Sequence, residues 1–469
     1  VFCAPGVIEA GKPTNTAERE VVGQGRDLMI VPDLGRAARV GATRIWVDAI
    51  HIQGAFFLKP HFAEVNLRAG DAIIVRSATG RVVETITGRG PKDMGSFWGL
   101  SAQGEEIFLE FHFSHEYSVS PFRVDKVVVG DIDPFAPLGN PENVCGSQDF
   151  EDVICYQGES SKWSNVMASV GVMNVGSTPT VGVWCSGSNV SSGNYVLTNH
   201  HCIPSQSACD TAEFVFRYYN ENCGAGPATN DWVSYRCGDV MVSSPWDACE
   251  VTPTTLDFAL TSVIGDPAST FGFVEVDPNP AVDGDAVYIV QHPLGRPHEI
   301  THGSGSDVEV DAPQLRYYNT LDTDGGSSGS PIFSQIDHRL VGLHHCGGCE
   351  TPGVGNRGIM MSEIYPLIED YVCSGFLDVA FAGSQGLAEV SGNGNAVIEP
   401  GETWQFHPVV RNRACTDEAL GVIGDVVLNA GSTGPVSITN GAASFGDVSA
   451  KQTQPSQLPV IFQVDMGVT

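Results

Sequence analysis

Three short segments place a histidine, an aspartate and a serine in settings that suit acyl-transfer chemistry. His201 ends the apolar stretch NYVLTNHHC, Asp257 is the only acid in the apolar stretch TLDFALTSV, and Ser328 lies in the glycine-rich turn GGSSGSPIF. An imidazole titrates near neutrality and can act as general base for a hydroxyl nucleophile, while a buried carboxylate fixes the tautomer of that imidazole. We therefore predict a catalytic triad of His201, Asp257 and Ser328.

The order of these residues along the chain adds to the argument. Each segment alone has an ordinary structural explanation, as a buried acid, a histidine beside a cysteine and a surface turn. Together they follow the order His, Asp, Ser, which is the order in chymotrypsin, whereas other common triads run Ser, Asp, His or Asp, His, Ser. Gly326 lets the backbone turn so that its own N–H and that of Ser328 can converge on a developing oxyanion.

The elements that must position these residues are mostly strands. Alternating stretches such as TRIWVDAIHI and AIIVRS, separated by Gly, Asn and Asp turns, predict a mostly β chain. A chain of 469 residues is too long for one core. We predict an N-terminal β-sandwich over 1–138, a catalytic domain over 139–378 and a C-terminal Ig-like β-sandwich over 379–469, with an incomplete last sandwich as an alternative. The proline-rich stretch at 130–146 would be a linker, and MSEIYPLIEDYV a helix starting after Ser362.

Charge and cysteine content indicate the compartment and exclude some partners. The formal net charge is -31, which would repel nucleic acid and anionic membrane surfaces. Thirteen cysteines indicate an oxidising compartment, so we predict a secreted protein. The sequence contains no apolar run long enough to span a bilayer, and it begins at Val1, so we expect that an export signal has been removed.

The motifs quoted above resemble those of trypsin-like serine peptidases, and most closely those of bacterial lysyl endopeptidases. The likeness spans 144–373 and includes VCGSQDFEDVIC, CSG, LTNHHC, FRYYNENC, LDFAL, YIVQHP, and GSSGSPIF followed by LVGLHH. It implies a double β-barrel protease, protein or peptide substrates, and no cofactor. It also implies a pro-region before the protease, which would assist folding or restrain the enzyme in cis until the linker is cut. Ser327 stands where pancreatic-type trypsins carry an acid, so an N-terminal salt bridge cannot be the switch.

The same resemblance implies part of the disulfide pattern. The implied pairs are Cys185 with Cys202, Cys155 with Cys223, and Cys145 with either Cys349 or Cys346. On proximity alone Cys237 could pair with Cys249, and the odd total leaves at least one thiol free or linked outside the chain. We read HHCGGC as containing disulfide cysteines rather than zinc ligands, and assign no metal ligand.

The residue before the cut bond has two competing predictions. Asp322 lies six residues before the nucleophile, and a carboxylate at the base of the pocket would favour Lys or Arg. Thr323 and His344 instead look like the pair that glutamyl endopeptidases use to hold an acidic side chain. The acid that lysyl endopeptidases place after this histidine is absent, because NRG stands at 356–358. A basic preference is our first prediction and an acidic one the alternative, although His344 could also be a core histidine.

Other classes of function remain as alternatives. The chain could be an inert protease-fold adhesin or binding protein, although all three triad residues are present. An esterase of the α/β-hydrolase kind would need another triad order and helical crossovers. GNGNAVIEPGET has the look of an acidic calcium loop, yet it offers Asn where Asp would bind a hard cation best, so calcium there is only an alternative.

Overall fold

The computed structural model describes most of the chain. The described residues are 20–131, 144–177, 180–224, 232–245, 249, 253–303, 307–318, 321–349, 354–372, 379–412, 414, 418–428, 436–450 and 452–465. They divide into two compact units, one ending at Ile368 and the other holding Glu369–Thr469.

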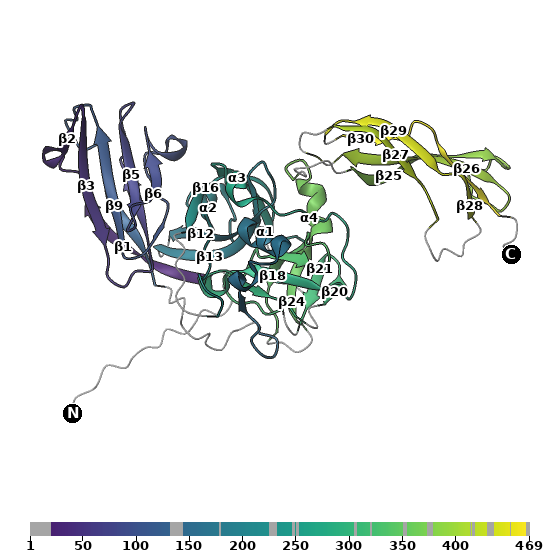
Figure 1. The fold of residues 1–469 in the computed structure, drawn as a ribbon, viewed down its shortest axis with the longest axis horizontal. Coiled ribbons are helices and arrows are strands. Elements are labelled where there is room, and N and C mark those ends of the chain that lie inside the picture. The colour runs from purple at the N-terminus through teal and green to yellow at the C-terminus, as the bar shows by residue number, and fades with distance from the viewer. Residues whose placement is uncertain are drawn as a thin grey trace. The chain divides into compact units, whose positions relative to one another are not determined.

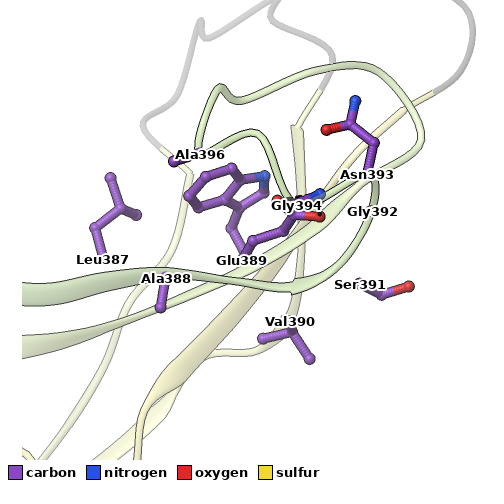
Figure 2. Close-up of a pocket in the computed structure, with 10 residues that line it drawn as sticks. Leu387, Ala388, Glu389, Val390, Ser391, Gly392, Asn393, Gly394 and Ala396 are labelled. Carbon is purple, nitrogen blue, oxygen red and sulfur yellow. Dashed lines mark hydrogen bonds between the residues drawn. The ribbon is translucent and has the colours of Figure 1, made fainter.

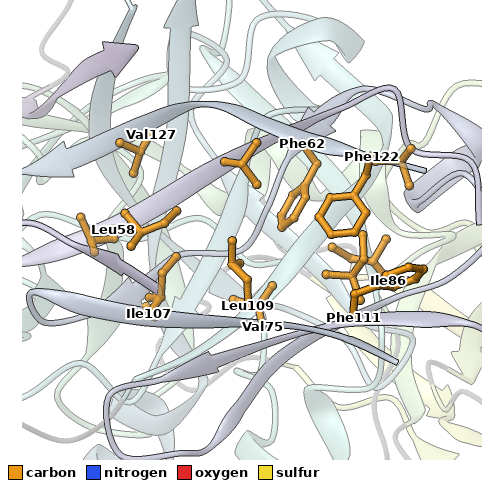
Figure 3. Packing of buried hydrophobic residues seen from close by; sticks show 14 of the residues in the cluster. Leu58, Phe62, Val75, Ile86, Ile107, Leu109, Phe111, Phe122 and Val127 are labelled. Carbon is orange, nitrogen blue, oxygen red and sulfur yellow. The ribbon is translucent and has the colours of Figure 1, made fainter. Parts of the chain in front are cut away.

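Residues 20–131 form a five-stranded antiparallel sheet facing a second layer of strands. The sheet has the order β2-β3-β9-β5-β6 and the second layer contains β1, β10, β4, β7 and β8. In β9 every second residue is buried, as the alternating sequence EIFLEFHF requires of a half-buried strand. Figure 3 shows Phe62, Phe111 and Phe122 meeting in the core between the layers. The bounds are β1 (Glu20–Ile30), β2 (Ala38–Val40), β3 (Thr43–His51), β4 (Phe57–Ala63), β5 (Ala72–Ser77), β6 (Val82–Ile86), β7 (Phe97–Trp98), β8 (Ala102–Gln103), β9 (Glu106–Phe113) and β10 (Arg123–Gly130), with 3-10 turns η1 (Leu34–Arg36) and η2 (Pro91–Asp93).

The second layer continues into the central region through strand β1 (Figure 1). This strand pairs antiparallel with β10 on one side and with β13 on the other. Strand β13 belongs to a closed barrel with the order β12-β15-β16-β17-β14-β13, in which β12 pairs back to β13. The second layer of residues 20–131, made of β1, β4, β7, β8 and β10, therefore belongs to one eleven-stranded sheet with the first barrel, and no division between compact units falls near 138. The barrel strands are β12 (Ser169–Ser177), β13 (Thr180–Asn189), β14 (Tyr195–Thr198), β15 (Glu213–Phe216), β16 (Val233–Ser244) and β17 (Phe258–Ile264).

The second half of the central region is an eight-stranded sheet that curves into an open half-barrel. Its order is β11-β19-β18-β22-β23-β24-β21-β20. The predicted mostly β, trypsin-like double-barrel fold is thus confirmed. The strands are β11 (Glu151–Asp152), β18 (Val287–Gln291), β19 (Glu299–Thr301), β20 (Val308–Asp311), β21 (Gln314–Tyr317), β22 (Pro331–Ser334), β23 (Leu340–Cys346) and β24 (Asn356–Met360).

Helices are few and short in the central region. They are α1 (Ser160–Ala168), α2 (Gln206–Cys209), α3 (Ala268–Phe271) and α4 (Met361–Ile368), with 3-10 turns η3 (Val153–Tyr156) and η4 (Pro293–Gly295). Helix α4 corrects the prediction for MSEIYPLIEDYV. It begins at Met361, so Ser362 lies inside it, and it stops at Ile368.

The second unit contains two further antiparallel sheets. One has the order β25-β26-β31-β28 with β30 beside β26, and the other pairs β27 with β29. Phe445 and Val460, from different sheets, share a small apolar core. The Ig-like assignment of this region stays a prediction. The strands are β25 (Val379–Ser391), β26 (Thr403–Asn412), β27 (Ala419–Asp425), β28 (Val436–Asn440), β29 (Ala442–Val448), β30 (Thr453–Pro455) and β31 (Val460–Val464).

Candidate active site

His201 and Asp257 meet in a buried corner of the first barrel. The Nδ1 atom of His201 lies 2.7 Å from Oδ2 of Asp257, and the His201 backbone N–H donates to Oδ1 at 3.0 Å. Asp257 has a φ of 40°, an unusual value for this residue type, and Asn199 Nδ2 donates to its carbonyl oxygen at 2.8 Å. The strained backbone is thus held by the same turn that carries the histidine. We call Asn199, His201, Cys202 and Asp257 the base–acid corner.

A second imidazole, which the sequence analysis missed, lies beside the same carboxylate. His345 on β23 is fully buried, and its Nδ1 lies 3.7 Å from Asp257 Oδ2. The side-chain amide of Gln314 faces the other ring nitrogen, with Nε2 to Nε2 at 3.1 Å. Because the amide nitrogen can only donate, this contact places the His345 proton on Nδ1, toward Asp257. The doublet HH in LVGLHH was the available signal, and only its first member was considered.

The base–acid corner favours an ionised Asp257. Burial alone would raise the pKa of this carboxyl, but the imidazole of His201, with a smaller effect of the nearby imidazole of His345, holds the pKa below its usual value. An ionised acceptor keeps the proton of His201 on Nδ1. Nε2 is then the ring nitrogen that can take a proton from a nucleophile.

Ser328 lies in a turn in which two of the three glycines, Gly326 and Gly329, cannot be replaced without a clash. Gly326 has a φ of 90°, and a Cβ there would lie 2.7 Å from the carbonyl oxygen of His292. Gly329 has a φ of 85°, and a Cβ there would overlap the carbonyl oxygen of Ser186. Both positions need glycine for conformation and for space. We call residues 324–330 the nucleophile turn.

Strand β13 connects the nucleophile turn to the base–acid corner. The N–H of Ser186 donates to the carbonyl of Ser328 at 2.8 Å, and its hydroxyl donates to the carbonyl of Gly326 at 2.9 Å. Its neighbour Cys185 forms a disulfide with Cys202, and Cys202 Sγ lies 3.8 Å from the Ser328 carbonyl. The structure thus brings the three predicted triad residues into one buried region. Ser186 lies in the quoted motif CSG, but the sequence alone did not suggest this role.

The carboxylate of Asp322 is already engaged by the backbone. Oδ1 accepts from the N–H of Cys145 and Oδ2 from the N–H of Asp149, both at 2.8 Å. The side chain is fully buried, and burial raises its pKa to about 6 although both backbone hydrogen bonds act to lower it. Both oxygens therefore anchor the start of the central region in this structure.

Thr323 and His344 have different surroundings from Asp322. Thr323 is fully buried, and its hydroxyl has no hydrogen-bond partner among the described residues. His344 flanks the nucleophile turn, since its backbone exchanges 2.9 Å hydrogen bonds with Gly329 and Ser330. Its Nδ1 contacts the hydroxyl of Tyr317, and burial lowers its pKa to about 3. The His344 ring is therefore neutral at physiological pH.

Five disulfides link cysteines of the central region. Three of them are pairs that the resemblance implied, and the pairing of Cys237 with Cys249 is wrong. Cys237 lies beside Cys209 on an adjacent segment, while Cys249 reaches β23, because spatial neighbours need not be close in sequence. Both cysteines of HHCGGC are bonded. The free or externally linked thiol that the odd total requires falls outside the described residues. The pairs are Cys145–Cys349, Cys155–Cys223, Cys185–Cys202, Cys209–Cys237 and Cys249–Cys346.

One group of side chains in the described part of the chain has the proximity of metal ligands. It consists of Cys185, Cys202 and His201. The two sulfurs form a disulfide and the ring Nδ1 faces Asp257, so the group offers no thiolate ligands. Among the described helices none is long and apolar enough to cross a membrane.

The segment considered for calcium borders a surface pocket of about 550 Å³ in the second unit, shown in Figure 2. Its carboxylates accept hydrogen bonds from their own loop. Glu402 accepts from the N–H groups of Asn393 and Glu399, and Glu389 accepts from that of Gly394 at 2.9 Å. These hydrogen bonds all lie within the loop and hold it closed. Calcium at this loop remains only the alternative stated from the sequence.

Comparison with known proteins places the site in a class. Residues 185–343 match the family of trypsin-like peptidase domains, so the central region contains a trypsin-like peptidase domain. A protein named secreted RxLR effector protein 73, from Plasmopara viticola, is 28% identical over 342 residues, covering 69% of this chain and 81% of that protein.

Solved structures with similar folds include several proteases. A Glu endopeptidase is 20% identical with a TM-score of 0.35, covering 49% of this chain and 98% of that one. The protease Anisep from Arthrobacter nicotinovorans is 16% identical with a TM-score of 0.34, covering 45% and 98%. The VesB protease of Vibrio cholerae is 15% identical with a TM-score of 0.32, covering 66% and 89%.

Proposed function

We propose that the chain is a serine endopeptidase in which His201, Asp257 and Ser328 act as the triad. The observation that carries this is the buried 2.7 Å contact between His201 Nδ1 and Asp257, in a corner tied through β13 to the Ser328 turn. His201 Nε2 takes the hydroxyl proton as Ser328 attacks a peptide carbonyl. The same proton then goes to the leaving amine, and water hydrolyses the acyl-enzyme.

The developing oxyanion would be held by the backbone N–H groups of Gly326 and Ser328. The turn is rigid before substrate arrives, because Ser186 fixes the carbonyls of both residues. Preorganised donors of this kind typically contribute about 10²- to 10³-fold to the rate. A loop that had to reorganise during reaction would lose much of this contribution.

For the residue before the cut bond, the contacts favour an acidic side chain over the basic one predicted first. Both oxygens of Asp322 already accept backbone N–H groups, so a Lys or Arg side chain would have to compete for them. The buried hydroxyl of Thr323 has no hydrogen-bond partner among the described residues, so it can bind a substrate side chain. When Tyr317 donates to Nδ1 of His344, Nε2 of that ring carries the hydrogen and can donate to a carboxylate, which would compete with the hydrogen bond between this side chain and the backbone of Arg357. Basic specificity through Asp322 remains the alternative that the experiment decides.

Secretion and cis-regulation complete the proposal. Five disulfides suit an oxidising compartment, and the similar Plasmopara viticola protein is named as secreted. Residues 20–131 pack on the protease region within one unit, which is the arrangement that action in cis needs. The substrates would be extracellular proteins or peptides.

A peptide library decides the activity and its specificity together. The purified chain, before and after limited proteolysis at 130–146, is incubated with mixed peptides, and the cleavage sites are read by mass spectrometry. Cuts should disappear in Ser328→Ala and persist in Ser330→Ala, a matched control whose buried hydroxyl makes no hydrogen bond to the described residues. Cleavage after Glu supports Thr323 and His344, and cleavage after Lys or Arg supports Asp322. No cleavage in any form would favour the inert binding protein.

A further inference from the structure

Strand β13 pairs with two different strands along one of its edges. Its residues Ser188 and Asn189 pair with β14, and its residues 181–184 pair with β1. In that second pairing Glu20 lies opposite Trp184, and Val21 lies opposite Val183. The backbone positions just before Cys185, which is disulfide-bonded beside the catalytic histidine, are therefore occupied by a strand of the N-terminal region.

This part of β13 leads up to Cys185, which lies beside the proposed catalytic histidine. In the proposed mechanism His201 returns its proton to the amine of the leaving peptide, so that peptide must pass the imidazole. The sulfur of Cys185 and a ligand atom of the His201 ring lie within 4.8 Å of each other. Residues 181–184 directly precede Cys185 on the same strand. An extended peptide leaving the site could therefore pair with this edge, as peptides often do with strand edges.

The first residue of β1 also reaches the nucleophile turn. A Cβ on Gly325 would lie 2.7 Å from Oε2 of Glu20, so the Glu20 carboxylate lies directly against that glycine. Strand β1 also contacts η4, whose residue Leu294 bonds to the carbonyl of Gly325. Glu20 thus stands one residue away from Gly326, the proposed oxyanion donor.

Close packing holds β1 against β13. A Cβ on Gly25 would lie 2.6 Å from Cγ2 and 2.8 Å from the carbonyl oxygen of Thr180, and Gly182 packs against Gly23. Val22 of β1 lies in an apolar core with Trp184 and Trp232 of the central region. The two strands approach each other as neighbours in a folded sheet do, with glycines where a side chain would not fit.

Buried charges reinforce the same interface. Lys59 on β4 and Glu213 on β15 form an ion pair at 3.0 Å, and both side chains are almost fully buried. Arg236 on β16 donates through Nε to Glu84 at 2.8 Å. Breaking such pairs leaves unpaired charges in the interior, which is strongly unfavourable. Cutting the chain within 132–143 leaves all of these contacts in place.

We propose that the β13 edge at residues 181–184 is the binding site for the leaving-group half of the peptide substrate, and that strand β1 occupies it in the full chain. The proposal rests on the proposed peptidase function and specifies how residues 20–131 act in cis. Strand β1 then closes the leaving-group half of the cleft. Substrates with a small leaving group can therefore react, whereas peptides that continue past the cut bond must displace β1, which competes at high effective concentration.

Two matched substrates test the proposal on the full chain. Both carry the acyl-side peptide that the library experiment identifies. One ends in p-nitroanilide and the other continues for four residues beyond the bond. Gly25→Val, which cannot fit against Thr180, is expected to raise kcat/KM for the extended peptide at least tenfold and to change that for the anilide less than twofold. Gly158→Val is the control, because a Cβ there meets no atom within 4 Å.

The outcomes separate the two proposals. If folded Gly25→Val and the unchanged chain cleave the extended peptide equally well, while both hydrolyse the anilide, the occupied edge is wrong and the peptidase stands. If neither substrate is hydrolysed and a fluorophosphonate does not label Ser328, both proposals fail.

Hydrogen exchange provides a test that does not need the glycine variant. In the Ser328→Ala chain, the extended peptide at a concentration that saturates binding should displace β1. The amides of residues 20–24 should then exchange at least tenfold faster, while those of β9 keep their rates. Unchanged exchange in residues 20–24 with peptide bound would overturn the proposal.

Discussion

The base–acid corner and the proposed pocket wall, Asp322 and Thr323, each bury an aspartate, but the two carboxylates have different partners. Asp257 faces the imidazoles of His201 and His345, and its pKa lies below the usual value. Asp322 faces the backbone N–H groups of Cys145 and Asp149, and burial raises its pKa to about 6. A buried carboxylate beside imidazoles can hold an imidazole in the tautomer that accepts a proton, whereas one that accepts backbone N–H groups mainly holds two segments together. Burial of an acid therefore does not by itself indicate its role.

The largest effect is expected when each of the two aspartates is replaced by asparagine. Asp257→Asn should lower kcat by about 10⁴-fold, because the amide no longer holds the proton of His201 on Nδ1. Asp322→Asn, at a site equally buried, should lower kcat less than tenfold. Steady-state kinetics on the anilide substrate measures both. A loss of less than tenfold in Asp257→Asn would contradict the triad, and loss of all cleavage after Lys or Arg in Asp322→Asn would restore the basic pocket.

The pocket wall itself is tested at Thr323. Thr323→Val keeps the shape of the side chain and removes the hydroxyl. If that hydroxyl donates to an acidic substrate side chain, kcat/KM for Glu-containing peptides should fall roughly 10- to 100-fold, because a hydrogen bond to a charged group is typically worth about 1.5–3 kcal/mol. Competition between Glu and Gln peptides measures the preference. An unchanged ratio would exclude Thr323 from the pocket.

A smaller effect is expected at the second imidazole of the base–acid corner. His345→Phe removes the donor that faces Asp257, so kcat should fall about three- to tenfold and the acid limb of the pH profile should move to higher pH. His345→Gln can still donate and should recover most of the rate. A pH profile with the same acid limb in all three chains would show that His345 only fills space.

The smallest effect concerns stability and pH at Asp322. Because its pKa is raised in the folded chain to about 6 from an ordinary value near 4, the folded chain binds more protons than the unfolded chain between those values. Its contribution to stability is therefore present at low pH and is lost as pH rises through about 6. Unfolding melts should show the original chain losing stability relative to Asp322→Asn between pH 4 and 7. A constant difference in Tm would contradict the raised pKa.

Local patterns predicted many of the strands and missed the contacts between distant segments. The stretches TRIWVDAIHI and AIIVRS coincide with β3 and β5, because alternation of apolar and polar residues is a local property. The extent of α4 was wrong at both ends, because apolar periodicity alone does not decide where a short helix begins and stops. The pairing of β1 with β13 joins residues about 160 positions apart in the chain, and no local pattern specifies such a register.

The sequence by itself determined which side chains are available for chemistry and where the backbone must turn. The sequence places a histidine, an aspartate and a serine in apolar or glycine-rich settings, with glycines at 326 and 329. These are local properties on which both the fold and the proposed chemistry depend. Only the tertiary structure decided what surrounds each carboxylate. Cys145 and His345 reach Asp322 and Asp257 from segments far along the chain, and the environment that such contacts create sets the role of a buried acid.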